Sequence, residues 1–330
     1  MEVLSIVTNI SRYGGAQKVM MDIHHGLKGQ LSSKILSLQA FDTVHPQYFL
    51  SEADFIRFGN PLQLNNKTVL VHARNLLPFL LAMKKLFFLN TRIIYVSHSV
   101  YTTHKNLTFF PKEIVSISNK VTENLQNYFK VPIMDINLIH NGIKDCLETN
   151  EFQEPYQGDK IRILYPGRIN NSKRQVQILN ALRGALDKRI EIHFAGVGED
   201  FETLLSNCWD EQFQCLGFIE DMDRLIMSYD YVMLYSLQEG LSLSLIEGLM
   251  HGKPLLMNDV GGNLEIGIPG VNAFLLNDRL DLLAFTLNGL VHVSKDEYMR
   301  LSHNSRSHYL ERFQYKDMIY NYLQLLNNRA

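Results

Sequence analysis

A segment in the second half of the chain places two glutamates around the start of a predicted helix. Glu239 precedes this helix, and Glu247 lies more than one turn inside it. Backbone N–H groups at a helix start bind anions such as a diphosphate, and carboxylates accept hydrogen bonds from hydroxyl groups. The segment therefore predicts a site for a ligand with phosphates and hydroxyls, whereas the two glutamates alone would also fit an ordinary capped helix. The residues around the helix start are Gly240, Leu241, Ser242, Leu243 and Ser244.

Two cations follow a predicted strand that spans residues 161–166. Arg168 comes two residues after the strand, and Lys173 precedes the next predicted helix. A guanidinium and an ammonium at the carboxyl end of a strand commonly hold phosphate charge. We therefore expect both to contact a diphosphate, although either one alone would be explained equally well as a solvated surface cation.

Glycines follow the first predicted strand and open a helix at Gly14 and Gly15. Without side chains they let the backbone approach a ligand closely. Neither this pair nor the run Gly196-Val197-Gly198 has the G-x-G-x-x-G spacing of a dinucleotide site. A nicotinamide-dependent activity is therefore weakly supported.

The elements that must position these residues alternate regularly along the chain. Short runs rich in Val and Ile predict strands, and amphipathic runs predict helices. Such alternation is typical of doubly wound parallel sheets, and two successive series predict two Rossmann-like α/β domains. The predicted strands are residues 3–7, 34–38, 68–72, 92–97, 114–118, 161–166, 190–195, 231–235 and 254–257, and the predicted helices are residues 16–27, 76–89, 120–128, 175–186, 201–207, 243–250, 279–290, 295–309 and 315–326.

The domain boundary is predicted from a polar, acidic stretch in the middle of the chain. It divides the sequence into a first domain over residues 1–145, a linker over residues 146–160 and a second domain over residues 161–314. Ligands of doubly wound sheets bind at the carboxyl ends of the strands. Two such domains that face each other would therefore enclose a cleft.

Composition excludes several classes of protein. The 330 residues are 46% hydrophobic and 20% charged with a net charge of −2, which is typical of a globular protein and not of a nucleic-acid binder. Three cysteines (Cys146, Cys208 and Cys215) provide neither a disulfide framework nor zinc-site spacing, so a reduced, cytoplasmic setting is expected. No signal peptide is expected, because Met1-Glu2 leads directly into a short predicted strand followed by the polar Thr8-Asn9. No membrane-spanning segment is expected, because the longest apolar run, residues 76–89, is short and contains two lysines.

One window of the first domain is strongly basic. Residues 55–112 contain eight basic residues and no acidic residue, and they include the apolar run 76–88. This combination would suit attachment to an anionic membrane surface. The alternative is a buried helix with solvated lysines. The eight residues are Arg57, Lys67, Arg74, Lys84, Lys85, Arg92, Lys105 and Lys112.

Further short motifs occur in an order that spans nearly the whole chain. They are Gly14-Gly15-Ala16-Gln17, Val96-Ser97-His98, Ser116-Ile117-Ser118, Ile139-His140-Asn141-Gly142-Ile143, Gly167-Arg168 with Lys173, Phe194-Ala195-Gly196-Val197-Gly198, Leu216-Gly217-Phe218-Ile219, Glu239 and Glu247 with Gly252-Lys253-Pro254, Gly261-Gly262, and Gly270-Val271-Asn272-Ala273. In this order and spacing they resemble retaining GT-B glycosyltransferases of glycosyltransferase family 4, whose E-x7-E signature the two glutamates match. The resemblance implies a GT-B fold, in which the helix 315–330 returns to the first, acceptor-binding domain and the second domain binds the donor.

The resemblance also implies a role for each matching residue. Arg168 and Lys173 would grip the donor diphosphate and stabilise the leaving nucleotide. Glu247 would bind the ribose hydroxyls, Glu239 would bind the transferred sugar, and backbone amides at the helix start would serve the phosphate and sugar. His98, at a strand end, would lie across the cleft near the sugar and the acceptor, unless it is a structural histidine.

Weaker expectations concern the acceptor and the detailed fit to the sugar. His72 and Arg74 also follow a predicted strand, so they are candidates for acceptor binding. Many relatives have glycine at the position of Ser242 and an aromatic residue at that of Leu241. These two departures leave the fit at the sugar open.

Asp221-Met222-Asp223 has the short D-x-D pattern with which another glycosyltransferase fold holds a divalent ion, so a metal site is one interpretation of this segment. Here the two acids open a predicted helix, where capping and the helix dipole favour acids. In the fold that the chain resembles, cationic side chains of the protein neutralise the charge of the donor phosphates. We therefore expect neither a metal nor another cofactor.

The activity that the resemblance implies is transfer of a sugar, with retention, from a UDP- or GDP-type donor to a glycan or lipid-linked acceptor. Such a reaction would serve cell-surface polysaccharide synthesis on the cytoplasmic side of the plasma membrane. Two alternatives remain open: a GT-B sugar-nucleotide epimerase, and a catalytically silent subunit that binds the nucleotide and another protein.

Overall fold

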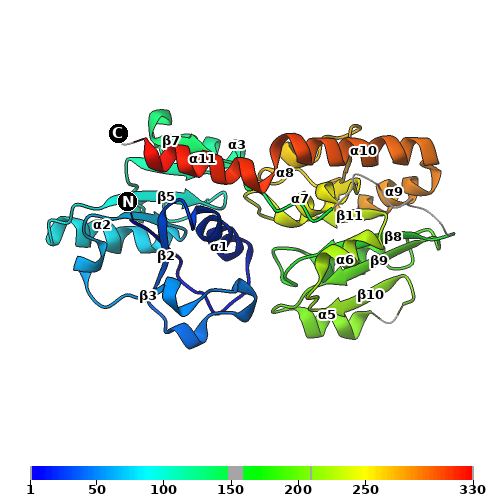
Figure 1. The fold of residues 1–330 in the computed structure, drawn as a ribbon. Coiled ribbons are helices and arrows are strands. Elements are labelled where there is room, and N and C mark those ends of the chain that lie inside the picture. The colour runs from blue at the N-terminus through cyan, green and yellow to red at the C-terminus, as the bar shows by residue number, and fades with distance from the viewer. Residues whose placement is uncertain (1, 148–158, 209, 329–330) are drawn as a thin grey trace. The chain divides into compact units, whose positions relative to one another are not determined.

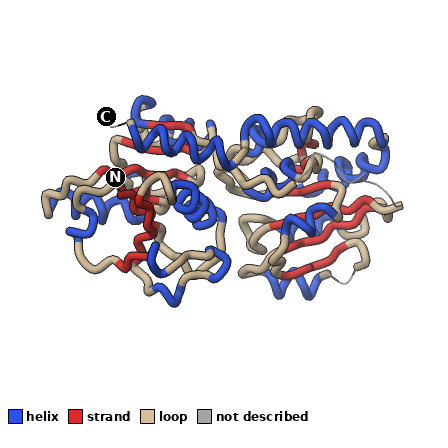
Figure 2. The backbone as a smooth tube through the Cα atoms, in the orientation of Figure 1, coloured by secondary structure: helices blue, strands red, loops and turns tan. Residues whose placement is uncertain are grey.

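The computed structural model describes residues 2–147, 159–208 and 210–328, and the chain forms two compact units (Figure 1). Unit 1 comprises Met1–Asn141 and Tyr315–Ala330, and unit 2 comprises Gly142–Gln314. Most of the predicted linker 146–160 lies outside the described residues. Each unit is an alternation of strands and helices around one sheet (Figure 2).

Unit 1 is built on a seven-stranded parallel sheet of order β3-β2-β1-β4-β5-β6-β7. Its central strands are almost completely buried, as expected for a parallel sheet covered on both faces. The order reverses between β1 and β4, so the loops after these two strands meet at a topological switch point. The strands are β1 (Glu2–Ile6), β2 (Ser32–Ser37), β3 (Phe55–Arg57), β4 (Thr68–Val71), β5 (Arg92–Ser97), β6 (Glu113–Ser116) and β7 (Ile136–Leu138).

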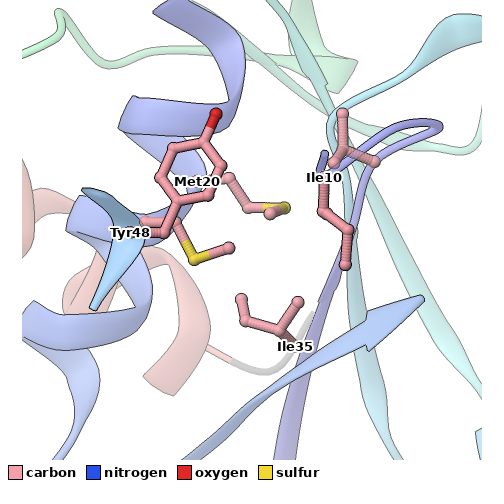
Figure 3. Close-up of a cluster of buried hydrophobic side chains, with 6 residues drawn as sticks. Ile10, Met20, Ile35 and Tyr48 are labelled. Carbon is pink, nitrogen blue, oxygen red and sulfur yellow. The ribbon is translucent and has the colours of Figure 1, made fainter. Parts of the chain in front are cut away.

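The loop between β1 and α1 (Gly15–Leu27) rests on a cluster of buried side chains (Figure 3). Ile10 comes from the loop itself, Met20 from α1 and Ile35 from β2. The ring of Tyr48 is buried with them, and its hydroxyl donates to Arg12 O at 2.7 Å. The apolar cluster and this hydrogen bond together position the backbone that leads to Gly14 and Gly15.

The last helix, α11 (Tyr315–Asn327), completes unit 1 by packing on α1. The Tyr315 hydroxyl donates to Asp22 O at 2.8 Å. Gly26 lacks the side chain that would block this approach, because a Cβ there would lie 2.3 Å from Ile319 Cδ1. Arg92 donates to the carbonyls of Leu325, Leu326 and Asn328 at the end of α11 and also pairs with Glu113.

The other helices of unit 1 are α2 (Leu77–Leu86) and α3 (Asn119–Asn127). The helix predicted over residues 76–89 is shorter in the structure. Its first predicted residue belongs to the 3-10 turn Arg74–Leu76, and Phe88 adopts a left-handed conformation with φ 51° after the helix ends.

Unit 2 is built on a six-stranded parallel sheet of order β10-β9-β8-β11-β12-β13. Its order reverses between β8 and β11, so the loops after these strands meet at a second switch point. The strands are β8 (Ile161–Pro166), β9 (Ile190–Ala195), β10 (Phe213–Gly217), β11 (Tyr231–Leu234), β12 (Leu255–Met257) and β13 (Ala273–Leu275).

The helices of unit 2 follow the predicted alternation, but α8 lies outside the predicted helices, α10 extends three residues further than predicted, and two other predicted helices are shorter or divided. The helix predicted over residues 175–186 ends at Leu182, because Gly184 turns the chain with φ 71°. The helix predicted over residues 279–290 consists of the 3-10 turn Leu280–Leu282, α9 and the 3-10 turn Gly289–His292. The helices are α4 (Gln175–Leu182), α5 (Phe201–Asn207), α6 (Met222–Met227), α7 (Leu243–Met250), α8 (Asn263–Ile266), α9 (Leu283–Asn288) and α10 (Lys295–Arg312).

The prediction of two doubly wound parallel α/β sheets is confirmed. Among the described residues, no helix combines the length and the apolar character needed to cross a membrane.

Candidate functional site

A buried hydroxyl joins the two loops that meet at the switch point of unit 2. Tyr165, near the end of β8, is fully buried, and its hydroxyl accepts a hydrogen bond from Tyr235 N at 2.9 Å. The same hydroxyl lies within hydrogen-bond distance of Lys173 O and of Tyr235 O. Burial raises the pKa of Tyr165 well above its usual value, so the hydroxyl keeps its proton. The loop after β8 is therefore fixed to the end of β11.

Each of the two joined loops contributes one member of an ion pair. Lys173 Nζ contacts Glu239 Oε1, and both side chains are largely withdrawn from solvent. The backbone between them is also linked, because Leu237 N donates to Ser172 O at 2.8 Å. The structure thus brings together two residues that the sequence separates by 66 positions.

Arg168 stands on the same loop as Lys173 and is exposed. It follows Gly167, whose φ of 145° lies in a region that favours glycine. The Arg168 carbonyl accepts a hydrogen bond from Gln175 Nε2 at 3.0 Å, which fixes the loop to the start of α4.

The glycines after β9 pack closely against the backbone of the loop after β8. A Cβ at Gly196 would lie 2.0 Å from Gly167 O, and one at Gly198 would lie 2.1 Å from Ile169 O. Close packing of one backbone on another is therefore sufficient to require glycine at positions 196 and 198.

The start of α7 is fixed by a cap and by a neighbouring glycine turn. Ser242 is the N-cap residue; its Oγ accepts from Leu245 N at 3.4 Å and lies 3.0 Å from Ser244 Oγ. Gly262 N donates to Gly240 O at 2.9 Å, and a Cβ at Gly261 would lie 2.4 Å from Glu239 O. The Gly261-Gly262 turn therefore holds Glu239 and Gly240 in place, a role that their sequence alone does not reveal.

Glu247 lies on α7 and is partly buried. Its neighbour Gly248 allows α7 to approach the sheet, since a Cβ there would lie 2.9 Å from Leu255 Cδ2 and 3.0 Å from Val232 Cβ. Glu247 lies five positions after the N-cap Ser242, which is about 7.5 Å along the helix axis at ~1.5 Å per residue. Glu239 therefore lies before the start of α7, and Glu247 lies more than one turn inside the same helix.

The segment Gly252-Lys253-Pro254 has a structural role in unit 2. Gly252, with φ 64°, turns the chain after α7. The buried ammonium of Lys253 donates to Met227 O at 3.1 Å, and burial lowers the pKa of Lys253 to about 8. This lysine therefore fixes the end of α6.

In unit 1 the structure brings His72 and His98 together at the ends of the neighbouring strands β4 and β5. His72 Nδ1 lies 2.9 Å from His98 Nε2, and the rings are stacked with centroids 5.1 Å apart. Burial lowers the pKa of His98 to about 4 and, with the charge of His98 as a smaller cause, lowers that of His72 well below its usual value. Both rings are therefore neutral at pH 7, and one of them donates to the other.

The direction of this hydrogen bond follows from the second nitrogen of His72. His72 Nε2 is buried and has no hydrogen-bond partner among the residues that the structure describes. A buried N–H without an acceptor is costly and rare, whereas a lone pair without a donor is better tolerated. We therefore assign the proton of His72 to Nδ1, from which it points at His98 Nε2. His98 then carries its own proton on Nδ1, as a neutral donor.

The remaining predicted residues of unit 1 lie near the same edge of the sheet. Arg74 packs over the Tyr101 ring at 4.0 Å and donates to Thr103 O at 2.9 Å, so its guanidinium also stabilises unit 1 itself. Gly14 caps α1 with an extended backbone and no side-chain hydrogen bond, and Gly15 begins the helix. The roles of Arg74, Gly14 and Gly15 in binding stay predictions.

The two acids of the D-x-D pattern make separate contacts. Asp221 caps α6, since its Oδ1 accepts from Arg224 N at 2.9 Å. Asp223 Oδ1 lies 2.9 Å from His251 Nε2 instead. Capping, one of the two interpretations of this pattern, therefore applies to Asp221.

Comparison with solved structures identifies the fold. The crystal structure of Anabaena Alr3699/HepE in complex with UDP superposes with a TM-score of 0.81 over 100% of both chains, at 16% sequence identity. The pneumococcal O-GlcNAc transferase GtfA in complex with UDP and GlcNAc gives 0.78 over 99% of this chain and 98% of that chain, at 12% identity. With its two parallel sheets, the chain has the two-domain α/β fold known as GT-B.

Sequence comparison points to a family for part of unit 2. Residues 160–292 match the family model described as "Glycosyl transferases group 1", and this range contains Arg168, Lys173, Glu239 and Glu247. The putative glycosyltransferase EpsD of Bacillus subtilis (strain 168) is 29% identical over 127 residues, which cover 37% of this chain and 33% of EpsD. The O-antigen biosynthesis glycosyltransferase WbnH of Escherichia coli is 29% identical over 153 residues, which cover 46% and 42%. The chain thus spans between a third and a half of the length of the curated relatives that it matches.

Acid should destabilise unit 1 through the histidine pair. The pKa of His98 is about 4 in the folded protein, against ~6.5 in an unfolded chain. As the pH falls from about 6.5 to about 4, the unfolded chain takes up the proton first, so the free energy of unfolding falls, by up to about 3 kcal/mol for His98 alone. Urea unfolding across this pH range should show the decrease, and His72→Gln/His98→Gln should make it shallower; part of the decrease should remain, because burial also lowers the pKa of His24 to about 4.

The matched control is His104→Gln, because the His104 side chain is exposed. This variant should keep the full decrease. An equally steep decrease in the double variant would contradict the assignment of the histidine pair as an acid-labile group of unit 1.

Proposed function

We propose that the protein is a retaining glycosyltransferase that uses a nucleotide-diphosphate sugar, of UDP or GDP type, as its donor. The observation that carries this proposal is the contact of Lys173, on the loop after β8 that also carries Arg168, with Glu239, which precedes α7, at the switch point of unit 2. Support comes from the match of residues 160–292 to a glycosyltransferase family and from the UDP named in the description of a structural neighbour.

In this proposal Lys173 serves two negative groups at once. An ammonium has three N–H donors, so Lys173 can keep its contact with Glu239 while it donates to a phosphate oxygen. Arg168 adds a second, exposed cation to the same loop. The two cations, with the backbone amides from Leu241 to Ser244, stabilise the charge that grows on the departing diphosphate.

The carboxylates bind the hydroxyl groups of the donor. Glu247, further inside α7, accepts from the ribose, and Glu239, before the helix, accepts from the transferred sugar. Because Lys173 contacts Glu239, the sugar and the diphosphate are oriented by one connected group of side chains. Preorganised contacts of this kind lower the activation barrier.

The transfer step needs no protein nucleophile in this proposal. The bond between the anomeric carbon and the phosphate oxygen breaks, and the acceptor oxygen bonds to the same face of that carbon. The acceptor proton passes to the departing phosphate. A neutral His98, with a proton on Nδ1, would donate a hydrogen bond to a sugar or acceptor hydroxyl.

Nucleotide binding provides the first test. The matching nucleoside diphosphate should raise the melting temperature of the full chain, because a ligand that binds only the folded state stabilises it. Arg168→Ala and Lys173→Ala should reduce this rise and cost about 2–4 kcal/mol of transition-state stabilisation, or a rate lower by roughly 30- to 1000-fold.

The exposed Lys188 offers a matched control, and Lys188→Ala should behave as the parent does. The parent rate should be the same with and without added Mg²⁺ or Mn²⁺, because we propose that protein cations replace a metal at the phosphates. Parent-like rates in both cation variants would refute the diphosphate site, and a strict need for either metal would make Asp221 and Asp223 candidate ligands again. Recovery of an epimer of the donor sugar would identify an epimerase instead.

The two glutamates should differ in which ligand they affect. Glu247→Ala should weaken binding of the free nucleotide and of the nucleotide sugar alike, because both contain the ribose. Glu239→Ala should spare the nucleotide and weaken the nucleotide sugar. Calorimetric titration of each variant with both ligands measures the difference, and equal losses throughout would show that the proposed division is wrong.

We further propose that the acceptor is a glycan or lipid-linked glycan met at an anionic membrane, in cell-surface polysaccharide synthesis, and that the α2 tip docks there. The α2 tip comprises Lys84, Lys85, Leu86, Phe87 and Phe88. Phe88 is 93% exposed and Leu86 72% exposed, and both lysines are exposed. Phe88 is held in solvent by a left-handed backbone conformation, so its side chain buries no apolar surface when the protein folds. Its position beside two cations favours an anionic lipid surface.

The structure also reduces the number of cations in the basic window, residues 55–112, that are available to contact a membrane. Lys67 pairs with Glu2 at 3.0 Å, Arg92 pairs with Glu113, and Arg74 packs over Tyr101. The exposed cations of the window are Arg57, Lys84, Lys85, Lys105 and Lys112. Each cation near an anionic surface contributes on the order of 1 kcal/mol, reduced by salt.

Vesicle co-sedimentation tests the α2 tip. Binding should rise with the anionic lipid content and fall with salt, and Lys84→Glu/Lys85→Glu should abolish most of it. The control Lys120→Glu/Lys130→Glu makes the same change of charge at exposed positions elsewhere in unit 1 and should retain binding. Vesicle binding that does not change with anionic lipid content, with salt or with the substitutions in the α2 tip would refute the proposed membrane-docking surface.

A further inference from the structure

Three side chains able to bind a metal ion converge in unit 2, at the end of α7 opposite the candidate donor site. Cys146 lies in the segment that enters the unit, Asp223 in the first turn of α6, and His251 at the C-terminal cap of α7. One ligand atom from each lies within 4.8 Å of the other two. Their separation in the sequence explains why cysteine spacing alone gives no sign of such a site.

The distances identify the kind of arrangement. His251 Nε2 lies 3.6 Å from Cys146 Sγ and 2.9 Å from Asp223 Oδ1. The thiol and the carboxylate thus meet the same ring nitrogen, whereas a nucleophile–histidine–acid relay uses both ring nitrogens. Around a tetrahedral ion with bonds of ~2.3 Å to sulfur and ~2.0 Å to nitrogen or oxygen, ligand atoms lie about 3.3–3.6 Å apart. The sulfur–nitrogen distance already fits, and the carboxylate would need to move by about 0.4 Å.

We propose that Cys146, Asp223 and His251 form a zinc site, with one position left for water. A thiolate, an imidazole and a carboxylate suit Zn²⁺ far better than Mg²⁺ or Ca²⁺, which prefer oxygen ligands. The eight residues of α7 place this site about 12 Å from the start of the helix at ~1.5 Å per residue. The ion therefore has no part in the proposed transfer, and it ties the entry segment of unit 2 to α6 and α7.

The backbone around the ligands is held by α10. Arg306 donates to both carboxylate oxygens of Asp145, at 2.9 and 2.7 Å, and to Met250 O at 3.0 Å. Asp145 and Met250 are the chain neighbours of two of the ligands. The Tyr309 hydroxyl donates to Ile143 O at 3.0 Å. The backbone positions of Cys146 and His251 are therefore fixed by α10, and such preorganisation of the ligands is what a metal site requires.

The site combines one buried ligand with two accessible ones. The His251 side chain is 1% exposed and that of Asp223 is 52% exposed, and Cys146 is an exposed free cysteine. An ion can therefore enter from solvent. Zinc binds the thiolate, so it must displace the thiol proton of Cys146, and binding strengthens as the pH rises.

The second nitrogen of His251 limits the affinity. His251 Nδ1 is buried and, within the described part of the chain, has no hydrogen-bond partner. Zinc on Nε2 would force the proton onto Nδ1, and an unpaired buried N–H is costly. Metal-binding histidines usually have an acceptor at this position. We therefore expect a reversible site, weaker than a structural site with four cysteines.

Metal titration of the full chain tests this proposal. After treatment with a chelator and its removal, calorimetry should show one equivalent of Zn²⁺ bound, and Mg²⁺ should show none. Binding of Co²⁺ should produce the near-ultraviolet absorption of a thiolate–cobalt bond. Cys146→Ser should abolish this absorption, and Cys146→Ser and Asp223→Asn should each weaken zinc binding more than about tenfold.

The controls separate this site from the fold and from the donor site. Cys208→Ser removes another free cysteine of unit 2 and should leave the zinc and cobalt results unchanged. Both test variants replace exposed ligands and leave the buried His251 unchanged, so both should fold as the parent does. Their thermal response to nucleotide should therefore match that of the parent. Absence of stoichiometric zinc, or equal binding by the parent and both variants, would overturn the proposal.

Discussion

The hydroxyl of Tyr165 stands at the point where the strand order of the second sheet reverses, and it holds together the loops on both sides of that point. Parallel strands bring their carboxyl ends to one edge, but an edge alone does not bring side chains into contact. The hydroxyl supplies this contact by bonding the backbone of Lys173 and Tyr235 from within the core. A phenyl ring in its place would leave these groups unpaired, and the ion pair of Lys173 with Glu239 would lose its support.

The central elements of both sheets could be predicted from the sequence, and the edges could not. β5, β8 and β9 have the predicted bounds, because a strand buried on both faces is a continuous apolar run. The four strands without a prediction are β3, β7, β10 and β13, which are the four edges of the two sheets. Each is only partly buried, and three of the four (β3, β7 and β13) have only three residues, so their sequence signal is weak.

The candidate site was predictable to the level of individual loops, but not of contacts. The sequence places Lys173 and Glu239 on separate loops, and His72 and His98 on separate strand ends, while strand order decides that each pair meets. Motif residues also mix two kinds of role. Gly196 and Gly261 are required because backbones pack closely, and nothing in a sequence distinguishes such glycines from those that admit a ligand. Cys146 and His251 meet through the fold alone.

The return of α11 to unit 1 has a consequence for the order of biosynthesis. Tyr315 bonds to Asp22 across 293 positions of sequence, and Arg92 bonds to the end of the same helix. Unit 2, which lies between these partners in the sequence, is complete as a chain before α11 is made. Because domains fold as units during synthesis, unit 2 can reach its native state first, while the α1 face that receives Ile319 is still uncovered. The nascent chain therefore passes through a stage in which α1 has been made but α11 has not, and a chaperone would bind the uncovered face of unit 1 at that stage.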